Sequence, residues 1–275
     1  MADDHARIAP TAHVTAWIWR RIGMPHAEVF ATRRGWRLFW AFELLGAWWT
    51  RLLDRSPSLT QVLEYRHKLI EGAALGHRPD LLVEIAGGLS RRGVTFAVDH
   101  GIRTVEIDLP HMVAAKTAVL GESPLADRLD LHTVTALDAL SDGFAEALRE
   151  VVGDAQRPVV VMEGLITYFR MDQRERLLTS VARGLAGKDA IVLADLYTLE
   201  TRPETGLGAG ALKFAISLVT RGQGTQGSWA TNDEAEAFWK AAGFSAFDAV
   251  LPEELDAAAR PRLERGPMLI ARASV

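Results

Sequence analysis

Short apolar runs alternate with stretches of helical periodicity along most of the chain. The runs with strand character cover 81–86, 104–108, 131–137, 159–162, 190–196, 244–251 and 268–273. Two of the intervening stretches, 110–121 and 171–185, carry apolar residues at helical spacing and end at or near a glycine. Strands that alternate with helices in this way are typical of a mostly parallel sheet with helices on both faces.

The end of the chain departs from this alternation. Thr231 begins a capping box that opens a helix ending at Gly243. The last two strands then follow each other, and the prolines between them, Pro252 and Pro261, leave no room for a helix that a parallel crossover would need. The pattern therefore predicts an antiparallel last strand.

The beginning of the chain differs in composition, because it holds most of the tryptophan residues. Six of the eight tryptophans are Trp17, Trp19, Trp36, Trp40, Trp48 and Trp49. Bulky apolar residues recur at helical spacing over 36–53, but charges at Arg37, Glu43 and Arg51 argue against a membrane span. This stripe indicates either core packing or a lid over an apolar substrate. We expect a helical cap over 1–58 and an α/β domain over 59–275.

Composition narrows the classes of function. The chain has 275 residues, 48% of them hydrophobic and 24% charged, which is typical of a globular protein. Its 31 basic and 35 acidic residues give a net charge of −4, so we expect a small-molecule partner and no nucleic acid. Because charges interrupt the apolar stretch at 36–53, we also expect no membrane partner. The absence of cysteine excludes disulfides and thiolate chemistry and is compatible with a cytoplasmic location. No metal-binding motif occurs in the sequence.

Glycine or acidic residues follow four successive predicted strands. They are Gly87, Gly88, Glu106, Asp108, Asp138 and Glu163. Ligands bind beyond the carboxyl ends of strands in open parallel sheets, so these positions define a candidate site. Asp108 can accept hydrogen bonds from the two hydroxyls of a ribose, and Asp138 can accept one from an adenine amino group. Together these residues indicate a nucleoside site.

The glycine pattern does not indicate a dinucleotide. A literal G-x-G-x-x-G occurs at 222–227, but it follows a predicted helix at 212–219 instead of a strand, so we interpret it as a flexible loop. The first strand is followed by AGGLSRRG, which lacks the pyrophosphate turn. A nicotinamide-dependent oxidoreductase is therefore disfavoured, as are P-loop enzymes, common serine hydrolases and zincins, whose motifs are missing.

Several segments resemble a known family. LLVEIAGGLSRRG, TVEIDLPHMVAAK, TALDALSDG and VVVMEGLITYF resemble successive motifs of the leucine carboxyl methyltransferase family, which includes polyketide O-methyltransferases of the tetracenomycin type. The segment VLEYRHK at 62–68 resembles the arginine-bearing helix before the first strand of that family. The similarity extends from about residue 61 to the C-terminus.

The resemblance implies a class I methyltransferase domain: a Rossmann-like α/β fold with a seven-stranded sheet, an antiparallel last strand and S-adenosylmethionine as cofactor. It implies the following cofactor contacts: Arg66 with the methionine carboxylate, Gly87 and Gly88 beneath the cofactor, Asp108 and Glu106 with the ribose, Asp138 and Ala139 with the adenine, and Glu163 near the methionine amino group. One departure is Ser90, which stands where the family has an aspartate, whereas Arg92 keeps the family's arginine.

The expected reaction is methyl transfer to a carboxylate or phenolic hydroxyl of a small aromatic or polyketide-like acceptor. An ionised carboxylate needs no general base, whereas a phenol would benefit from one. His67, Tyr168 and His111 are candidates by location alone, and no base is assigned. The alternatives are a non-catalytic binding protein with the same fold and, less favoured, a nicotinamide-dependent oxidoreductase.

Overall fold

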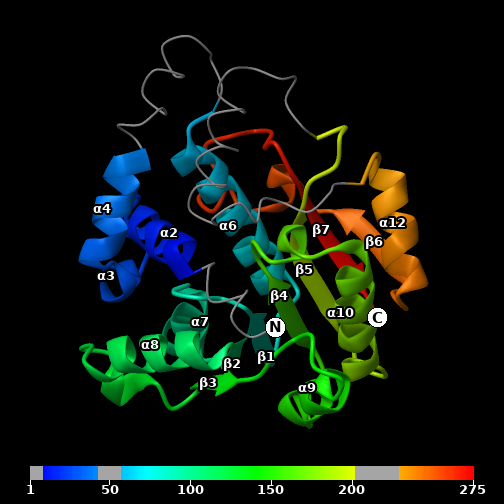
Figure 1. The fold of residues 1–275 in the computed structure, drawn as a ribbon, viewed down its shortest axis with the longest axis horizontal. Helices are drawn as coiled ribbons and strands as arrows, with labels where there is room; N and C mark the ends of the chain where they lie inside the picture. Colours follow the sequence, from blue (N-terminus) through cyan, green and yellow to red (C-terminus); the bar gives the residue numbers. More distant parts are fainter. Residues whose placement is uncertain (1–8, 43–56, 202–228) are drawn as a thin grey trace.

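The computed structural model describes residues 9–42, 57–201 and 229–275. Its centre is a seven-stranded sheet with the order β3-β2-β1-β4-β5-β7-β6 (Figure 1). The strands are β1 Leu81–Ile85, β2 Arg103–Asp108, β3 His132–Ala136, β4 Pro158–Met162, β5 Ile191–Leu196, β6 Ala246–Ala249 and β7 Leu269–Ser274. The helices are α2 Ala9–Arg21, α3 Ala27–Phe30, α4 Arg33–Phe42, α6 Leu59–Gly76, α7 Arg92–His100, α8 Pro110–Gly121, α9 Phe144–Val152, α10 Met171–Gly184 and α12 Asn232–Ala241.

The sheet confirms the predicted topology. β1 to β5 pair in parallel, and β7 is antiparallel to both β5 and β6. The chain winds outward from β1 to β2 and β3, then returns to place β4 on the other side of β1. The boundary between β1 and β4 is thus the topological switch point, where such sheets bind ligands.

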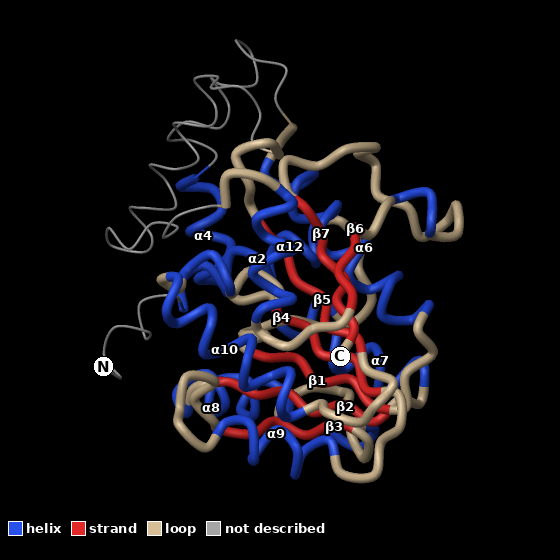
Figure 2. Tube along the Cα trace, turned by 90° about the vertical axis from the view of Figure 1, so that its right-hand side faces the viewer, coloured by secondary structure: helices blue, strands red, loops and turns tan. Residues whose placement is uncertain are grey.

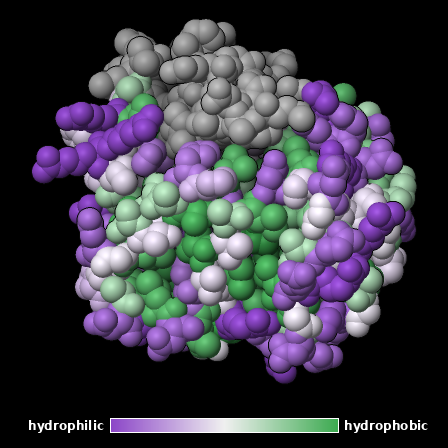
Figure 3. Space-filling view, turned by 60° about the horizontal axis from the view of Figure 1, so that its bottom comes forward, coloured by the Kyte–Doolittle hydropathy of each residue, from purple (hydrophilic) through white to green (hydrophobic). Residues whose placement is uncertain are grey.

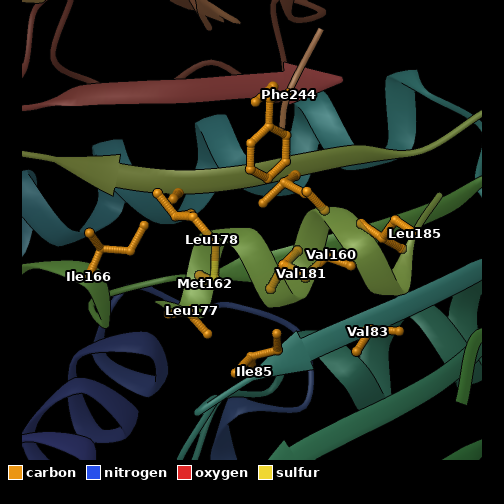
Figure 4. Close-up of a cluster of buried hydrophobic side chains, with 14 of the residues drawn as sticks. Val83, Ile85, Val160, Met162, Ile166, Leu177, Leu178, Val181, Leu185 and Phe244 are labelled. Atoms are coloured by element: carbon orange, nitrogen blue, oxygen red, sulfur yellow. The ribbon is translucent and has the colours of Figure 1, made fainter. Parts of the chain in front are cut away.

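Helices cover both faces of the sheet (Figure 2). On one face α10 packs its apolar side on the central strands, where Leu178 and Val181 lie beside Val160 and Met162 (Figure 4). On the other face α6 and α7 bury Leu69, Ile70 and Phe96 against the same strands. β1, β4 and β5 are consequently buried along their whole length, which accounts for their continuous apolar runs.

The N-terminal helices form a cap on the α/β domain. The buried Trp19 and Phe39 pack with Leu63 of α6, and Phe30 packs against α8. In the described part of the apolar stripe, residues 36–42, Phe39 is fully buried, whereas Trp36 and Trp40 are 47% and 42% exposed. The physical reason is that α2 covers only one side of α4.

Some predictions fall on residues outside the described part of the chain. These are the continuation of the apolar stripe beyond Phe42, with Trp48 and Trp49, and the glycine-rich segment at 222–227 with its preceding helix. Within the residues that the structure describes, no helix is long and apolar enough to cross a membrane. The face shown in Figure 3 carries hydrophobic side chains at its centre and hydrophilic ones around its margin.

Candidate functional site

The turn after β1, residues 86–88, lies at the switch point and presents mainly backbone atoms there, because two of its residues are glycines. Ala86 and Gly88 have φ angles of 56° and 58°, the left-handed region that favours glycine. A Cβ on Gly88 would lie 3.0 Å from the Cβ of Ala12 in the cap helix α2. A Cβ on Gly87 would lie 2.9 Å from the carboxyl carbon of Glu84. Both glycines therefore allow close packing around this turn.

Asp108 closes the turn from the neighbouring strand. Its Oδ2 accepts a hydrogen bond of 2.9 Å from the Gly88 N–H, and its Oδ1 accepts one of 2.7 Å from the Leu109 N–H. Burial raises the pKa of Asp108 above its usual value, and the two backbone donors only partly oppose this effect. The carboxylate stands at the end of β2, the place that the sequence predicted for it.

Arg66 reaches the switch point from α6. Its Nε donates to Glu163 Oε1 at 2.9 Å and its Nη1 donates to Asp195 Oδ2 at 3.3 Å. Asp195 also accepts from the Gly164 N–H, and a Cβ on Gly164 would lie 3.3 Å from Arg66 Nη1. The ends of β4 and β5 thus hold one guanidinium between two carboxylates.

Glu163 is the centre of a buried charge network. It accepts from Arg66 and Arg92, and its Oε2 lies 2.9 Å from His67 Nδ1. Burial by itself would raise the pKa of Glu163, but the charges of Arg92, His67 and Arg66 hold it well below the usual range. Arg92 also donates to Glu84 Oε1 at 2.5 Å. Glu163 therefore favours its ionised form and is held by three side chains from the two helices α6 and α7.

The cap touches this network directly. Trp19 of α2 stacks on the His67 ring with a centroid distance of 4.2 Å and an interplanar angle of 28°. Arg91 donates to Glu71 at 2.5 Å and contacts Met24 Sδ at 3.3 Å. An aromatic stack and a contact between a guanidinium and a thioether therefore link the cap to the charged groups of the site.

The residues predicted to border the adenine, Asp138 and Ala139, follow the end of β3. Leu137 N donates to the Asp108 backbone carbonyl at 3.0 Å, which brings the ends of β2 and β3 together. Asp138 Oδ1 accepts from Leu140 N at 2.9 Å, and Ala139 packs at the edge of the main core. Asp138 and Ala139 thus lie on the loop after β3, the strand that pairs with the Asp108 strand β2.

Glu106 has different partners. Its carboxylate is buried, pairs with Lys116 and lies 2.6 Å from His132 Nε2. Burial would raise the pKa of Glu106, but Lys116 and His132 lower it below the usual value. These contacts give Glu106 a role in fastening α8 to β2 and β3.

The three candidate bases lie in different environments. His67 is 1% exposed inside the charge network, whereas His111 is exposed at the start of α8. Tyr168 is mostly buried, and burial raises the pKa of its phenol, which also interacts with Thr11 of the cap. Tyr168 is therefore the candidate placed at the boundary between the cap and the strand ends.

Two residues of the network were missed by the sequence reading. Asp195 is the last residue but one of β5, so the strand-end rule that selected Glu163 also applies to it. Glu84 lies inside β1 among apolar residues, and no local pattern distinguishes its role. Ser90, the departure from the family, accepts from the Arg92 N–H at 3.2 Å and so supports the start of α7.

The comparisons with known proteins agree with this geometry. A curated relative of part of this chain is named for the S-adenosylmethionine-dependent methyltransferase class. That relative, from Parafrankia sp. (strain EAN1pec), is provisionally named an S-adenosyl-L-methionine-dependent methyltransferase and is 33% identical over 147 residues, 51% of this chain and 46% of its own length. Within this class, residues 59–182 match the model of the leucine carboxyl methyltransferase family, which confirms the resemblance seen in the motifs.

Solved structures confirm the fold class. A DUF574 family protein from Streptomyces avermitilis has a TM-score of 0.61 at 15% identity, with 96% of each chain covered. The structure of PigF with SAH has a TM-score of 0.51 at 15% identity and covers 77% of this chain and 56% of that one. At this identity the likeness shows the Rossmann-like methyltransferase fold alone. In the sequence comparison, the chain spans less than half the length of the curated relative from Parafrankia.

Proposed function

We propose that this protein transfers a methyl group from S-adenosylmethionine to an oxygen atom of a small aromatic or polyketide-like acceptor. The observation that carries the proposal is the meeting of three groups at the switch point: the glycine turn after β1, Asp108 and Arg66. The turn permits close approach, the carboxylate suits a ribose diol and the guanidinium suits an amino-acid carboxylate.

The residues present fit this cofactor. Arg66 would hold the methionine carboxylate, and Glu163 with Asp195 would surround the ammonium and sulfonium charges. Asp108 would exchange its hydrogen bonds to backbone N–H groups for bonds to the ribose hydroxyls. Gly164 supports the fit, since a side chain there would press on the Arg66 guanidinium at 3.3 Å.

The other predicted contacts follow from their positions. Gly87 and Gly88 would pass beneath the cofactor, and Asp138 with Ala139 would border the adenine. We assign Glu106 a supporting role instead of a ribose contact, because its carboxylate is already engaged by Lys116 and His132. When bound, the cofactor would supply the electrophilic methyl group, and positioning the acceptor oxygen would provide much of the rate.

We infer an acceptor that brings its own negative charge. The His67 ring lies in hydrogen-bond contact with Glu163 and stacks on Trp19, so we assign it to orienting the charge network and not to acting as the base for an acceptor. Tyr168, whose pKa is raised by burial, stays protonated at neutral pH and can donate a hydrogen bond to an acceptor oxygen. A carboxylate acceptor is the choice that needs no base. The cap would exclude water from this site.

We further propose that the acceptor is a small molecule and that the reaction takes place in the cytoplasm. The net charge of −4 gives no overall basic field for a nucleic acid. The chain contains no cysteine, so its stability requires no oxidising compartment. These features support the proposal and leave the particular acceptor to experiment.

The experiment has two arms. Saturating S-adenosylhomocysteine, at about a hundred times its Kd, should add about 2.7 kcal/mol to the free energy of unfolding and raise Tm, while NAD should leave Tm unchanged. Turnover is then followed as S-adenosylhomocysteine release over a panel of aromatic carboxylic acids and phenols. A Tm rise with NAD alone would contradict the cofactor, and cofactor binding without turnover on any acceptor would favour the non-catalytic alternative.

A further inference from the structure

The outward face of the cap helix α4 combines exposed indoles with arginines. Trp36 and Trp40 are the exposed tryptophans of the described chain, at 47% and 42%. They lie one turn apart, so they share a face of the helix with Arg33 and Arg37, which are both exposed. Every other tryptophan in the described residues is buried or half-buried, so this face is unlike the rest of the molecule.

The packing of α4 fixes the direction of this face. A Cβ on Gly35 would overlap the His13 backbone carbonyl, so the opposite side of the helix is pressed on α2. Phe39, on that inner side, is 0% exposed. Because the side of α4 that carries Gly35 and Phe39 packs on α2, Trp36 and Trp40 on the other side face outward.

The region around α4 is strongly basic. Residues 9–42 hold five arginines and one acidic residue, Glu28, and all six are exposed. Their net charge is +4 with neutral histidines. Because the whole chain has a net charge of −4, the remaining residues together carry −8. Arg21 extends the patch, since its guanidinium lies 4.9 Å from the Phe39 ring and 5.7 Å from the Trp40 ring. An acidic body thus carries a basic, aromatic end.

We propose that this face of α4 docks on a membrane surface that contains anionic lipid. Guanidinium groups bind lipid phosphates, and indole rings settle at the boundary between headgroups and acyl chains. A nucleic acid would satisfy the arginines but would offer no apolar boundary to two exposed indoles. The prediction of no membrane partner rests on the charges that interrupt the apolar stretch at 36–53, but surface docking needs no spanning segment. α4 is about 15 Å long and would lie in the plane of the interface.

The charge asymmetry would orient the molecule during docking. The basic end is attracted to an anionic surface while the acidic body is repelled, so the cap meets the lipid first. α2 joins α4 to the glycine turn through the contact of Ala12 with Gly88. Docking would therefore bring the strand-end site near the lipid, although surface binding itself does not depend on methyl transfer.

Sedimentation of the full chain with vesicles tests this proposal. One set of vesicles is phosphatidylcholine, and the other contains about a third phosphatidylglycerol, which gives a negative surface potential. We expect binding to the anionic vesicles only, and a loss of binding as salt rises. Arg33→Gln with Arg37→Gln should weaken binding by about fivefold for each charge removed. Trp36→Ser with Trp40→Ser should weaken it without reducing the salt dependence.

The controls remove the same groups elsewhere. Arg157→Gln with Arg176→Gln deletes two exposed charges of the α/β domain, and Met171→Ser deletes an apolar side chain that is 41% exposed. These variants should bind anionic vesicles like the unaltered protein, and far-UV circular dichroism checks that every variant folds. Equal binding to both vesicles, no binding, or equal losses in the control variants would overturn the proposal. Duplex DNA that competes at equal charge concentration would also overturn it, since the face would then be a general polyanion site.

Discussion

At the residue scale, the site depends on a guanidinium held between carboxylates. Arg66 lies 97 residues from Glu163 and 129 residues from Asp195, and it contacts both. A buried charge of this kind is stable only when its partners are fixed. Arg92 is held in the same way between Glu84 and Glu163, and its side chain is more deeply buried than that of Arg66.

Replacing Arg66 tests its proposed role in cofactor binding. Arg66→Gln should raise the Kd for S-adenosylhomocysteine about tenfold to a hundredfold, because hydrogen bonds between charged groups contribute about 1.5–3 kcal/mol. Isothermal titration calorimetry measures the change. The control is Arg272→Gln, which removes a guanidinium of β7 that pairs with Asp248 and Glu254 and not with the charge network. An unchanged Kd in Arg66→Gln would show that the arginine is placed wrongly.

The charge network also predicts a dependence of stability on pH. The pKa of Glu163 is lower in the folded state than the usual glutamate value of about 4.3, so ionised Glu163 stabilises the fold above that pH. This contribution is lost as the pH falls from about 4.3 through the folded pKa. Glu163→Gln should therefore reduce the free energy of unfolding by about 3 kcal/mol at neutral pH, and by progressively less in acid.

Urea unfolding at several pH values measures this difference. The matched control is Asp248→Asn, whose carboxylate is 56% exposed and pairs with Arg272. It should change the free energy of unfolding by no more than about 1 kcal/mol. A cost for Glu163→Gln that stays constant from neutral to acid pH would refute the assignment of an ionised, paired Glu163.

At the element scale, a glycine sets the packing of α7 on β2. A Cβ on Gly93 would overlap Glu106 Oε1, the carboxylate that pairs with Lys116 of α8. Gly93→Ala should force Glu106 from its partners and reduce the free energy of unfolding by about 3 kcal/mol. Gly121→Ala is the control, since no atom lies within 4 Å of its added Cβ. Thermal unfolding compares the two, and equal Tm values would contradict the close contact.

The element scale also shows where the pattern of apolar residues fails. The sequence predicts a strand over 244–251, but β6 covers only Ala246–Ala249. Phe244 is buried because it packs on Trp239 of α12, and its N–H bonds to the Trp239 carbonyl instead of a strand. An apolar residue is therefore buried next to a strand without joining its ladder, and periodicity cannot separate the two cases.

At the scale of the whole molecule, stability should follow the position of each strand in the sheet. β1, β4 and β5 are buried at every position, whereas β3 and β6 lie at the edges and are partly exposed. Native-state hydrogen exchange should therefore show the slowest amides in the three central strands and faster exchange in the edge strands. Mass spectrometry of peptides reads this order, and equal protection of β6 and β4 would contradict it.

The whole molecule also separates what the sequence by itself determined from what only the tertiary structure decided. Local features, which depend on neighbours along the chain, were readable: the bounds of α8, the start of α10, the antiparallel β7 and the position of Asp108 at a strand end. The motifs indicated, for the same reason, the family whose model matches residues 59–182. The partners of Arg66 and Glu106, and the outward face of α4, were decided by the fold, because they depend on which strands become neighbours and which side of a helix is covered.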